Sequence, residues 1–432
     1  MKEKKLHYGY VIVVAAFIQY LISGGVIYGA SGVFVVPVTT SMNISSGQFM
    51  LYMTFTNGAM AVAATLLAPK LLQKFRYTRI DAAAVISAGA GIILMGFSRN
   101  LIMFYIAGVL MGLGCCILTY LAAGTLIPRW FKMNQGSMIA TVLIGTRLGG
   151  IVFNPIASKL INSPALFGLA DSWRSTYLIL GLILLIVGLP NALFILKDYP
   201  SDKGLRAVWE EKAAAMAGTT VQVSGVDSKV AVKSGSFVFY VLMIITWNLA
   251  TTMYNYLSAY TSGTQAVNTA GFDLSGLVGS LAMIGALVGG FIIGSSNDRF
   301  GGHVGGIVAG AFGAGGLVIM LLGANSPVMI LMGSACFGVY YAISGVQMPA
   351  MVNTMYGNKD YDKIFQAGAK WGPWFGAVAA SLWGFVYDFS NSYTLSFILA
   401  AILCVLTSVF GVVAVLISKK LKDKWVTEEV KR

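Results

Sequence analysis

Apolar runs of about 20 residues, the length that crosses a bilayer as an α-helix, recur along the whole chain with short polar breaks between them. The runs are continuous and do not alternate with polar residues, which favours helices over the strands of a membrane barrel. The chain is 57% hydrophobic and 10% charged, whereas soluble domains carry about 25% charged residues. We therefore expect an all-α polytopic membrane protein.

Twelve transmembrane helices are predicted, arranged in two six-helix halves. The longest polar stretch, 197–236, follows the sixth span and is interpreted as a cytoplasmic linker. It separates an N-terminal half, 1–196, from a C-terminal half, 237–432. Two equal halves joined by one linker are typical of secondary transporters. The predicted spans are 10–38, 46–68, 80–97, 101–126, 135–160, 175–196, 237–262, 273–296, 303–324, 327–349, 364–388 and 393–418.

The basic residues are distributed unequally between the two sides that these spans define. Of the 29 Lys and Arg residues, 24 lie on the side of the N-terminus, and only Arg99, Lys159 and Arg174 lie on the other side. Cytoplasmic loops carry such an excess, so we expect a multi-pass protein of the cell inner (plasma) membrane with both termini cytoplasmic. This placement also accounts for the net charge of +13, and no nucleic-acid partner is expected.

The four cysteines, Cys115, Cys116, Cys336 and Cys404, all lie inside apolar runs. They lack metal-ligand spacing, so neither a metal site nor a disulfide framework is expected. No cofactor is predicted. The chain also lacks a nucleophile–base pair at membrane depth, and an enzymatic function is not expected.

Two cations are predicted within the spans: Arg147 near the middle of the fifth, and Lys370 about two turns into the eleventh. A cation on a transmembrane helix costs about 2.5–3.5 kcal/mol on insertion scales. Arginine offers a planar fork that matches a carboxylate, and lysine offers a point charge. One cation in each half would let a bound anion draw both halves together, so we expect a small organic anion as substrate.

The acidic residues lie outside the hydrophobic middle of every predicted span, with Asp81, Asp273 and Asp388 at helix ends. His7 and His303 are expected at cytoplasmic edges. Without a titratable acid or histidine at membrane depth, anion exchange or uniport is the simplest mode of transport. Proton symport through a buried lysine, whose charged form burial disfavours, remains an alternative, and a channel is a less favoured one.

A structural role is the competing explanation for both cations. Lys370 could extend its ammonium group to the cytoplasmic interface. Arg147 could donate to backbone carbonyls freed around Gly145, Gly149 and Gly150.

Polar and aromatic residues on other spans are expected to complete the pocket, since a carboxylate with an apolar body needs both kinds of wall. For any one of them, ordinary helix packing is the competing explanation. The predicted substrate-binding residues are Arg147, Lys370, Tyr28, Asn57, Tyr120, Tyr254, Asn255, Tyr341, Gln347, Trp371 and Trp374.

Four local motifs point to a known family: PRWF at 128–131, PSDKGL at 200–205, NDRFGG at 297–302 and GP at 372–373. Together they resemble the major facilitator superfamily, in its monocarboxylate and oxalate:formate porter branch. The resemblance covers nearly the whole chain. It implies a transporter of small organic anions that works by alternating access.

The NDRFGG motif is interpreted as a tight cytoplasmic turn, in which the glycines permit positive φ. Asp298 and Arg299 are predicted to act as a gating latch there, and a solvated turn without function is the alternative. The resemblance implies a similar acidic turn in the first half, yet the corresponding loop, 70–76, contains no acid. We expect the chain to work as a monomer in the lipid bilayer.

Overall fold

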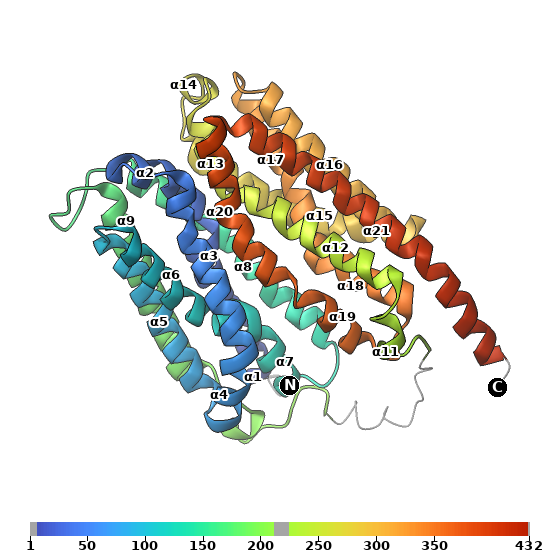
Figure 1. Cartoon of the computed structure of the whole chain (residues 1–432). Coiled ribbons are helices and arrows are strands. Elements are labelled where there is room, and N and C mark those ends of the chain that lie inside the picture. Colours follow the sequence, from blue (N-terminus) through green and yellow to red (C-terminus); the bar gives the residue numbers. More distant parts are fainter. Residues whose placement is uncertain (1–6, 211–223, 431–432) are drawn as a thin grey trace, which may run out of the picture. The chain divides into compact units, whose positions relative to one another are not determined.

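The computed structural model describes residues 7–210 and 224–430, with side chains as far as residue 421. Regular structure in these residues is helical, apart from two isolated β-bridges. Eleven helical stretches of this part of the chain are long and apolar enough to cross a membrane. The predicted span 364–388 is also helical, but Lys370 and Trp371 interrupt it. The predicted all-α membrane fold is confirmed (Figure 1).

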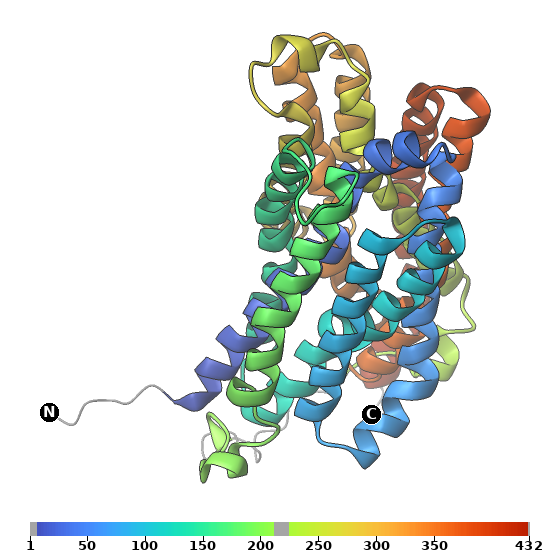
Figure 2. The same ribbon diagram turned by 90° about the vertical axis from the view of Figure 1, so that its left-hand side faces the viewer.

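The first compact unit comprises Met1–Ile44 and Gln48–Thr220, and its helices are coloured blue to green in Figure 2. Its core forms where α1 packs against α8, and where α5 packs against α6 and α9. Gly149 lies so close to the carbonyl of Leu21 that a Cβ would overlap it, and small residues allow such close helix packing in membranes. The α-helices of this unit are α1 (Tyr8–Gly24), α2 (Val35–Met42), α3 (Ser46–Val62), α4 (Ala68–Lys74), α5 (Tyr77–Phe97), α6 (Leu101–Cys115), α7 (Ala122–Trp130), α8 (Gln135–Ile161) and α9 (Ser172–Pro190).

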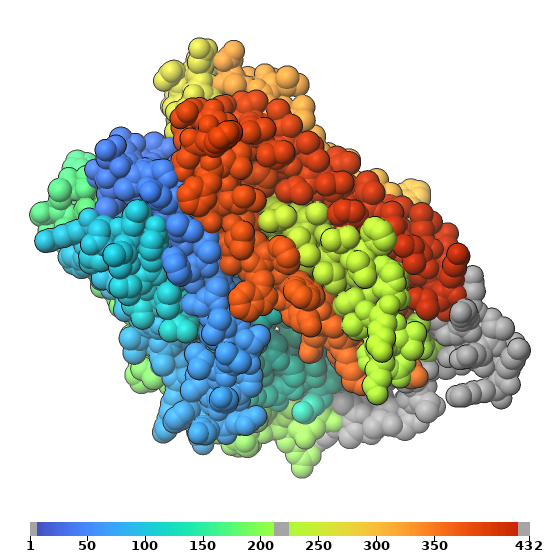
Figure 3. All heavy atoms as spheres, viewed as in Figure 1, coloured from blue at the N-terminus to red at the C-terminus, as the bar shows by residue number. Residues whose placement is uncertain are grey.

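The second unit comprises Val221–Arg432 together with Ser45–Gly47. Its core forms where α15 and α16 pack against α17, and where α12 and α16 pack against α21. Helix α21 runs along the surface of this unit (Figure 3) and exposes Ile398, Ile402 and Val405, as a lipid-facing helix would. The helices of this unit are α11 (Ser228–Ala231), α12 (Gly235–Thr251), α13 (Leu257–Ser262), α14 (Ala266–Thr269), α15 (Leu274–Phe300), α16 (Val304–Leu322), α17 (Pro327–Tyr341), α18 (Ile343–Tyr356), α19 (Tyr361–Ala369), α20 (Gly372–Ser390) and α21 (Tyr393–Val430).

Several spans contain a turn that is not α-helical. The wider π-helical geometry is rare and often marks functional positions. The spans of the first unit contain four π-turns and the 3₁₀ turn η2, and those of the second unit contain the 3₁₀ turn η7. These turns are η1 (Gly25–Gly29), η2 (Ser31–Phe34), η3 (Ala63–Leu67), η4 (Cys116–Leu121), η5 (Asn191–Ile195) and η7 (Thr252–Tyr256).

The described parts of the predicted linker, 197–236, are each attached to one unit. In the first part the backbone N–H of Val208 donates to the carbonyl of Trp130 at 2.8 Å. In the second part the N–H of Val226 donates to the carbonyl of Tyr356 at 2.9 Å. The sequence predicts a weakly structured middle of the linker, rich in small residues, at 213–225. Its residues 213–223 and the N-terminal lysines lie outside the described residues. We call the end of each unit to which a described part of the linker is attached, near Val208 or near Val226, its linker end.

Candidate substrate-binding and linker-end sites

Two predicted site residues of the first unit are in direct contact. The hydroxyl of Tyr28 donates to Oδ1 of Asn57 at 3.2 Å, joining the π-turn η1 to α3. Arg147 is partly buried within the apolar helix α8, and its Nη1 atom is shielded from solvent. Tyr120 lies on the π-turn η4 with 46% of its side chain exposed.

The second unit contains an aromatic cluster, which we define as Trp247, Tyr254 and Tyr341. The Tyr341 ring lies 6.1 Å from both of the others, edge-to-face in each case. The indole N–H of Trp247 donates to the carbonyl of Tyr340 at 3.2 Å, which fixes that ring. Asn255 is buried beside Tyr254 on the 3₁₀ turn η7. The structure thus brings two predicted residues together and adds Trp247, which the sequence analysis missed.

Lys370 lies where α19 ends, one residue before Trp371 caps α20. Its side chain is exposed, and its ammonium group lies 5.4 Å from the centre of the Trp371 ring. Trp371 and Trp374 are 41% and 46% exposed. An interrupted helix leaves backbone groups available to a ligand, as in the broken helices of many transporters.

Gln347 has protein partners for both ends of its amide group. Its Oε1 accepts from Asn297 Nδ2 at 2.8 Å, and its Nε2 donates to the carbonyl of Gly302 at 2.8 Å. Asn297 in turn accepts from the N–H of Gly305 at 2.9 Å. Gln347 is fully buried and holds the turn after α15, so we do not carry it into the proposed substrate site.

Asp298 and Arg299 lie on the last turn of α15 with exposed side chains. The turn itself has the predicted backbone, since Gly301 adopts φ +104°. Neither residue forms an ion pair with another described side chain. Their role as a gating latch remains a prediction.

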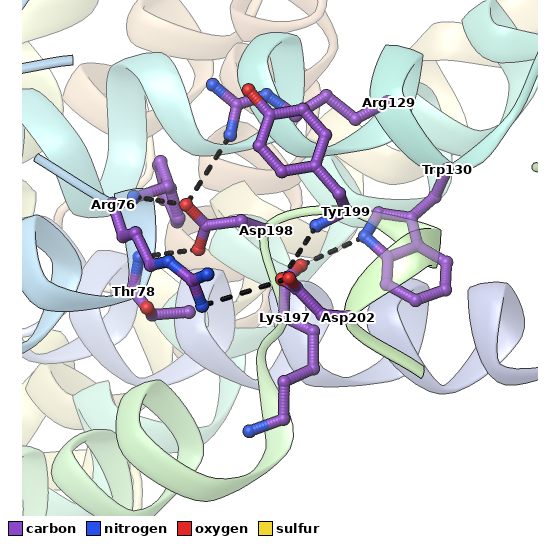
Figure 4. Close-up of polar contacts among 9 residues, drawn as sticks. Arg76, Thr78, Arg129, Trp130, Lys197, Asp198, Tyr199 and Asp202 are labelled. Atoms are coloured by element: carbon purple, nitrogen blue, oxygen red, sulfur yellow. Dashed lines mark hydrogen bonds and ion pairs between the residues drawn. The ribbon is translucent and has the colours of Figure 1, made fainter. Parts of the chain in front are cut away.

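A polar cluster at the linker end of the first unit was not predicted (Figure 4). Asp198 accepts from the backbone N–H groups of Tyr77 and Thr78, at 2.6 and 3.0 Å, and so caps α5. Its carboxylate lies 3.9 Å from Arg129, a residue of the PRWF motif. In the same motif, the indole N–H of Trp130 donates to the carbonyl of Lys197 at 2.9 Å.

A second acid, Asp202, completes this cluster. Its carboxylate lies 3.8 Å from the exposed guanidinium of Arg76 and accepts from the N–H of Tyr199 at 3.3 Å. Asp198 and Asp202 both follow the sixth span. They therefore supply the negative charge that loop 70–76 lacks. The sequence signals for the cluster were that missing acid and the PRWF and PSDKGL motifs, which contain Arg129 and Asp202.

Comparison with known families decides what kind of protein this is. Residues 16–365 match the family model described as Major Facilitator Superfamily. The chain belongs to the Major Facilitator Superfamily. It is therefore a multi-pass membrane transporter and not an enzyme.

Two relatives match parts of this chain. A gentisate transporter of Corynebacterium glutamicum is 30% identical over 231 residues, which are 52% of this chain and 46% of that protein. The uncharacterized MFS-type transporter YcxA of Bacillus subtilis is 28% identical over 130 residues, 30% of each chain. The matches thus span less than half of either relative.

A solved structure agrees with the fold over nearly the full length. A bacterial homologue of the human lysosomal transporter Spinster, solved in an inward-facing and unoccupied conformation, superposes with a TM-score of 0.65. The match covers 98% of both chains at 14% identity. At that identity the likeness supports the fold alone.

Proposed function

We propose that this chain transports small organic anions across the membrane by alternating access, with an aromatic carboxylate as the preferred cargo. The observation that carries the proposal is the position of Arg147, a cation within the apolar helix α8. A guanidinium in such a place needs negative charge or strong dipoles nearby. A cargo carboxylate can bind it through two parallel hydrogen bonds.

Two further observations support an aromatic cargo. One relative is a gentisate transporter, and gentisate is an aromatic carboxylate. The cluster of Trp247, Tyr254 and Tyr341 offers ring edges and faces at the spacing in which aromatic rings attract one another. Lys370 beside Trp371 offers a second cation next to an indole ring.

The interrupted helices support binding at these positions. Tyr28, Tyr120, Tyr254 and Asn255 all lie on π or 3₁₀ turns, and Lys370 lies at the break between α19 and α20. Broken helices in transporters place backbone dipoles against the substrate. On the basis of its motifs, we propose that the chain belongs to the monocarboxylate and oxalate:formate branch and that it exchanges one anion for another.

Reconstituted vesicles loaded with gentisate would test this function. Labelled gentisate outside should enter faster when unlabelled gentisate is inside, and Arg147→Ala and Lys370→Ala should each abolish this uptake. The matched controls Arg99→Ala and Lys359→Ala remove exposed loop cations and should leave it intact. Wild-type uptake in both site variants would overturn the proposal.

A binding measurement would separate loss of cargo binding from loss of movement. Gentisate should raise the unfolding temperature of the purified wild-type protein, because a ligand that binds only the folded state stabilises it. Neither Arg147→Ala nor Lys370→Ala should show this rise. Oxalate and lactate tested in the same way would define which carboxylates the pocket accepts.

A further inference from the structure

Asp81 is a carboxylate enclosed within the first unit. It is the fifth residue of α5, close to the helix end where the sequence predicts it, and it is 0% exposed. Its Oδ1 accepts from the hydroxyl of Tyr77 at 3.2 Å. Its Oδ2 is buried and has no hydrogen-bond partner among the described residues.

No basic side chain of the described residues forms an ion pair with Asp81. Arg129, whose charge acts on Tyr77, pairs instead with Asp198 and lies over the ring of Tyr199. From α1, the Tyr20 hydroxyl lies within electrostatic range of Asp81. The titratable groups on the elements packed against α5 are Lys70, Lys74, Tyr105, Cys115, Cys116, Tyr120, Arg174 and Tyr177, and Asp198 caps the N-terminus of α5.

An ionised carboxylate in this place would lack the partners that offset the loss of water. Burying an unpaired charge costs far more than burying the neutral acid, so such groups take up a proton. A single hydroxyl donor, Tyr77, does not satisfy the several lone pairs of a carboxylate. The geometry therefore favours the protonated form of Asp81 in the described conformation.

One residue, Tyr77, contacts both Asp81 and Asp198 of the linker end. Tyr77 bonds Asp81 through its hydroxyl, and its own backbone N–H is held by Asp198. Asp198 lines a pocket on the linker end together with Arg76, Thr78, Lys197, Asp202 and Lys203. A change in the charge of Asp81 would therefore act directly on the cap of α5.

We propose that Asp81 is a proton-binding site, protonated in the described conformation, and that loss of its proton slows transport. The effect on transport rests on the proposed organic-anion function, but proton binding itself does not. The step is a simple exchange: a hydronium ion gives a proton to the carboxylate oxygen and becomes water, and a water molecule later takes the proton back as hydronium.

Infrared difference spectra of the purified full chain, recorded between low and high pH, test proton binding without any substrate. Wild-type protein should show the C=O stretching band of a protonated carboxylic acid, which disappears as the pH is raised. Asp81→Asn should lose this band, and the control Asp227→Asn, which changes an exposed carboxylate, should keep it. Tyr77→Phe should shift the band without removing it, because only the hydroxyl donor is lost. A full wild-type band in Asp81→Asn would overturn the proposal.

Gentisate exchange in vesicles, measured as a function of pH, tests the link to transport. One titrating group changes the ratio of its two forms about tenfold per pH unit, so wild-type exchange should fall by up to that factor for each unit of rising pH. Asp81→Asn should stay at the faster rate throughout, since the amide mimics the neutral acid, and Asp227→Asn should follow the wild type. An unchanged pH profile in Asp81→Asn would refute the link. If the wild-type protein moved no gentisate, the organic-anion function would fail, and the infrared result would still decide the proton site.

Discussion

The carboxylate of Asp198 caps helix α5 by accepting from the backbone N–H of Tyr77 at 2.6 Å, across a sequence separation of 121 residues. The first N–H groups of a helix lack partners within that helix. A carboxylate there satisfies them and interacts favourably with the helix dipole. The chain after the sixth span is thus fixed to the start of the third. This contact lies within one unit, so it can hold the beginning of the linker in place throughout a transport cycle.

Removing this cap should destabilise the first unit. We expect Asp198→Ala to lower the free energy of unfolding by about 1–2 kcal/mol for the lost cap. Arg129, only 21% exposed, would lose its charged partner and add to that cost. The unfolding temperature of the purified protein would report the change. Asp202→Ala is the matched control, since its partner Arg76 is 67% exposed and exposed pairs contribute about 0–1 kcal/mol. Equal effects of the two substitutions would contradict the assignment.

Gln347 should prove to be a structural residue. Gln347→Leu would leave the amide of Asn297 and the carbonyl of Gly302 without their partners, which costs about 1–3 kcal/mol for a buried group. A lowered unfolding temperature with an unchanged apparent affinity for gentisate is the expected pattern. Gln366→Leu, at an exposed position of α19, serves as control. A loss of affinity at normal stability would instead restore Gln347 to the substrate site.

The fold could be predicted because the bilayer demands long apolar helices, and eleven of the twelve predicted spans pass that test of length and apolarity. The interruption of the eleventh span at Lys370–Trp371 could not be predicted in this way. The hydrophobic content of a segment does not distinguish a regular α-helix from a helix that contains a π-turn. The π-turn that carries Tyr28 therefore could not be predicted either.

The contacts that the sequence did not predict join residues that are distant in sequence. Asn297 and Gln347 are 50 residues apart, and a single sequence gives no reason to pair them. Asp81 was placed at a helix end by counting from the polar loop. Whether that position is open to water depends on how α9 and η5 pack against α5. Trp247 joined the aromatic cluster for the same reason, since only packing shows which rings meet.

The hydrogen bond that attaches α11 to Asp360 should be lost only in strong acid. The backbone N–H of Ser228 donates to Asp360 at 2.9 Å, and this bond, followed by that from Lys363, lowers the pKa of Asp360 to about 2. A lowered pKa means that the contact stabilises the folded chain above the ordinary carboxyl range and is lost as the pH falls toward 2. Hydrogen exchange of the Ser228 amide should therefore show protection from neutral pH down to about pH 4, and less below it.

Two comparisons control that experiment. Asp360→Asn should expose the Ser228 amide to faster exchange at neutral pH and should remove the extra loss in acid. The amide of Val226 bonds to the carbonyl of Tyr356, which does not titrate, so its protection should not follow the same curve. Parallel loss at both amides would indicate unfolding of the whole segment and count against a role for Asp360.

The aromatic cluster should distinguish ring-bearing cargo from aliphatic cargo. Tyr341 lies at its centre, 6.1 Å from both Trp247 and Tyr254. An aromatic pair contributes about 0.5–1.5 kcal/mol beyond burial, which corresponds to roughly a twofold to tenfold change in affinity. Tyr341→Ala should therefore raise the apparent KM for gentisate by about that factor and leave the KM for an aliphatic carboxylate such as lactate nearly unchanged.

The control for this variant is Tyr361→Ala, because Tyr361 stacks on Phe365 near the linker end of the same unit. It should affect both cargoes equally or neither. Tyr341→Phe keeps the ring and should retain the preference for gentisate, which separates ring contact from hydroxyl chemistry. If Tyr341→Ala weakened gentisate and lactate to the same degree, the cluster would act by supporting α17 and η7 rather than by touching the cargo.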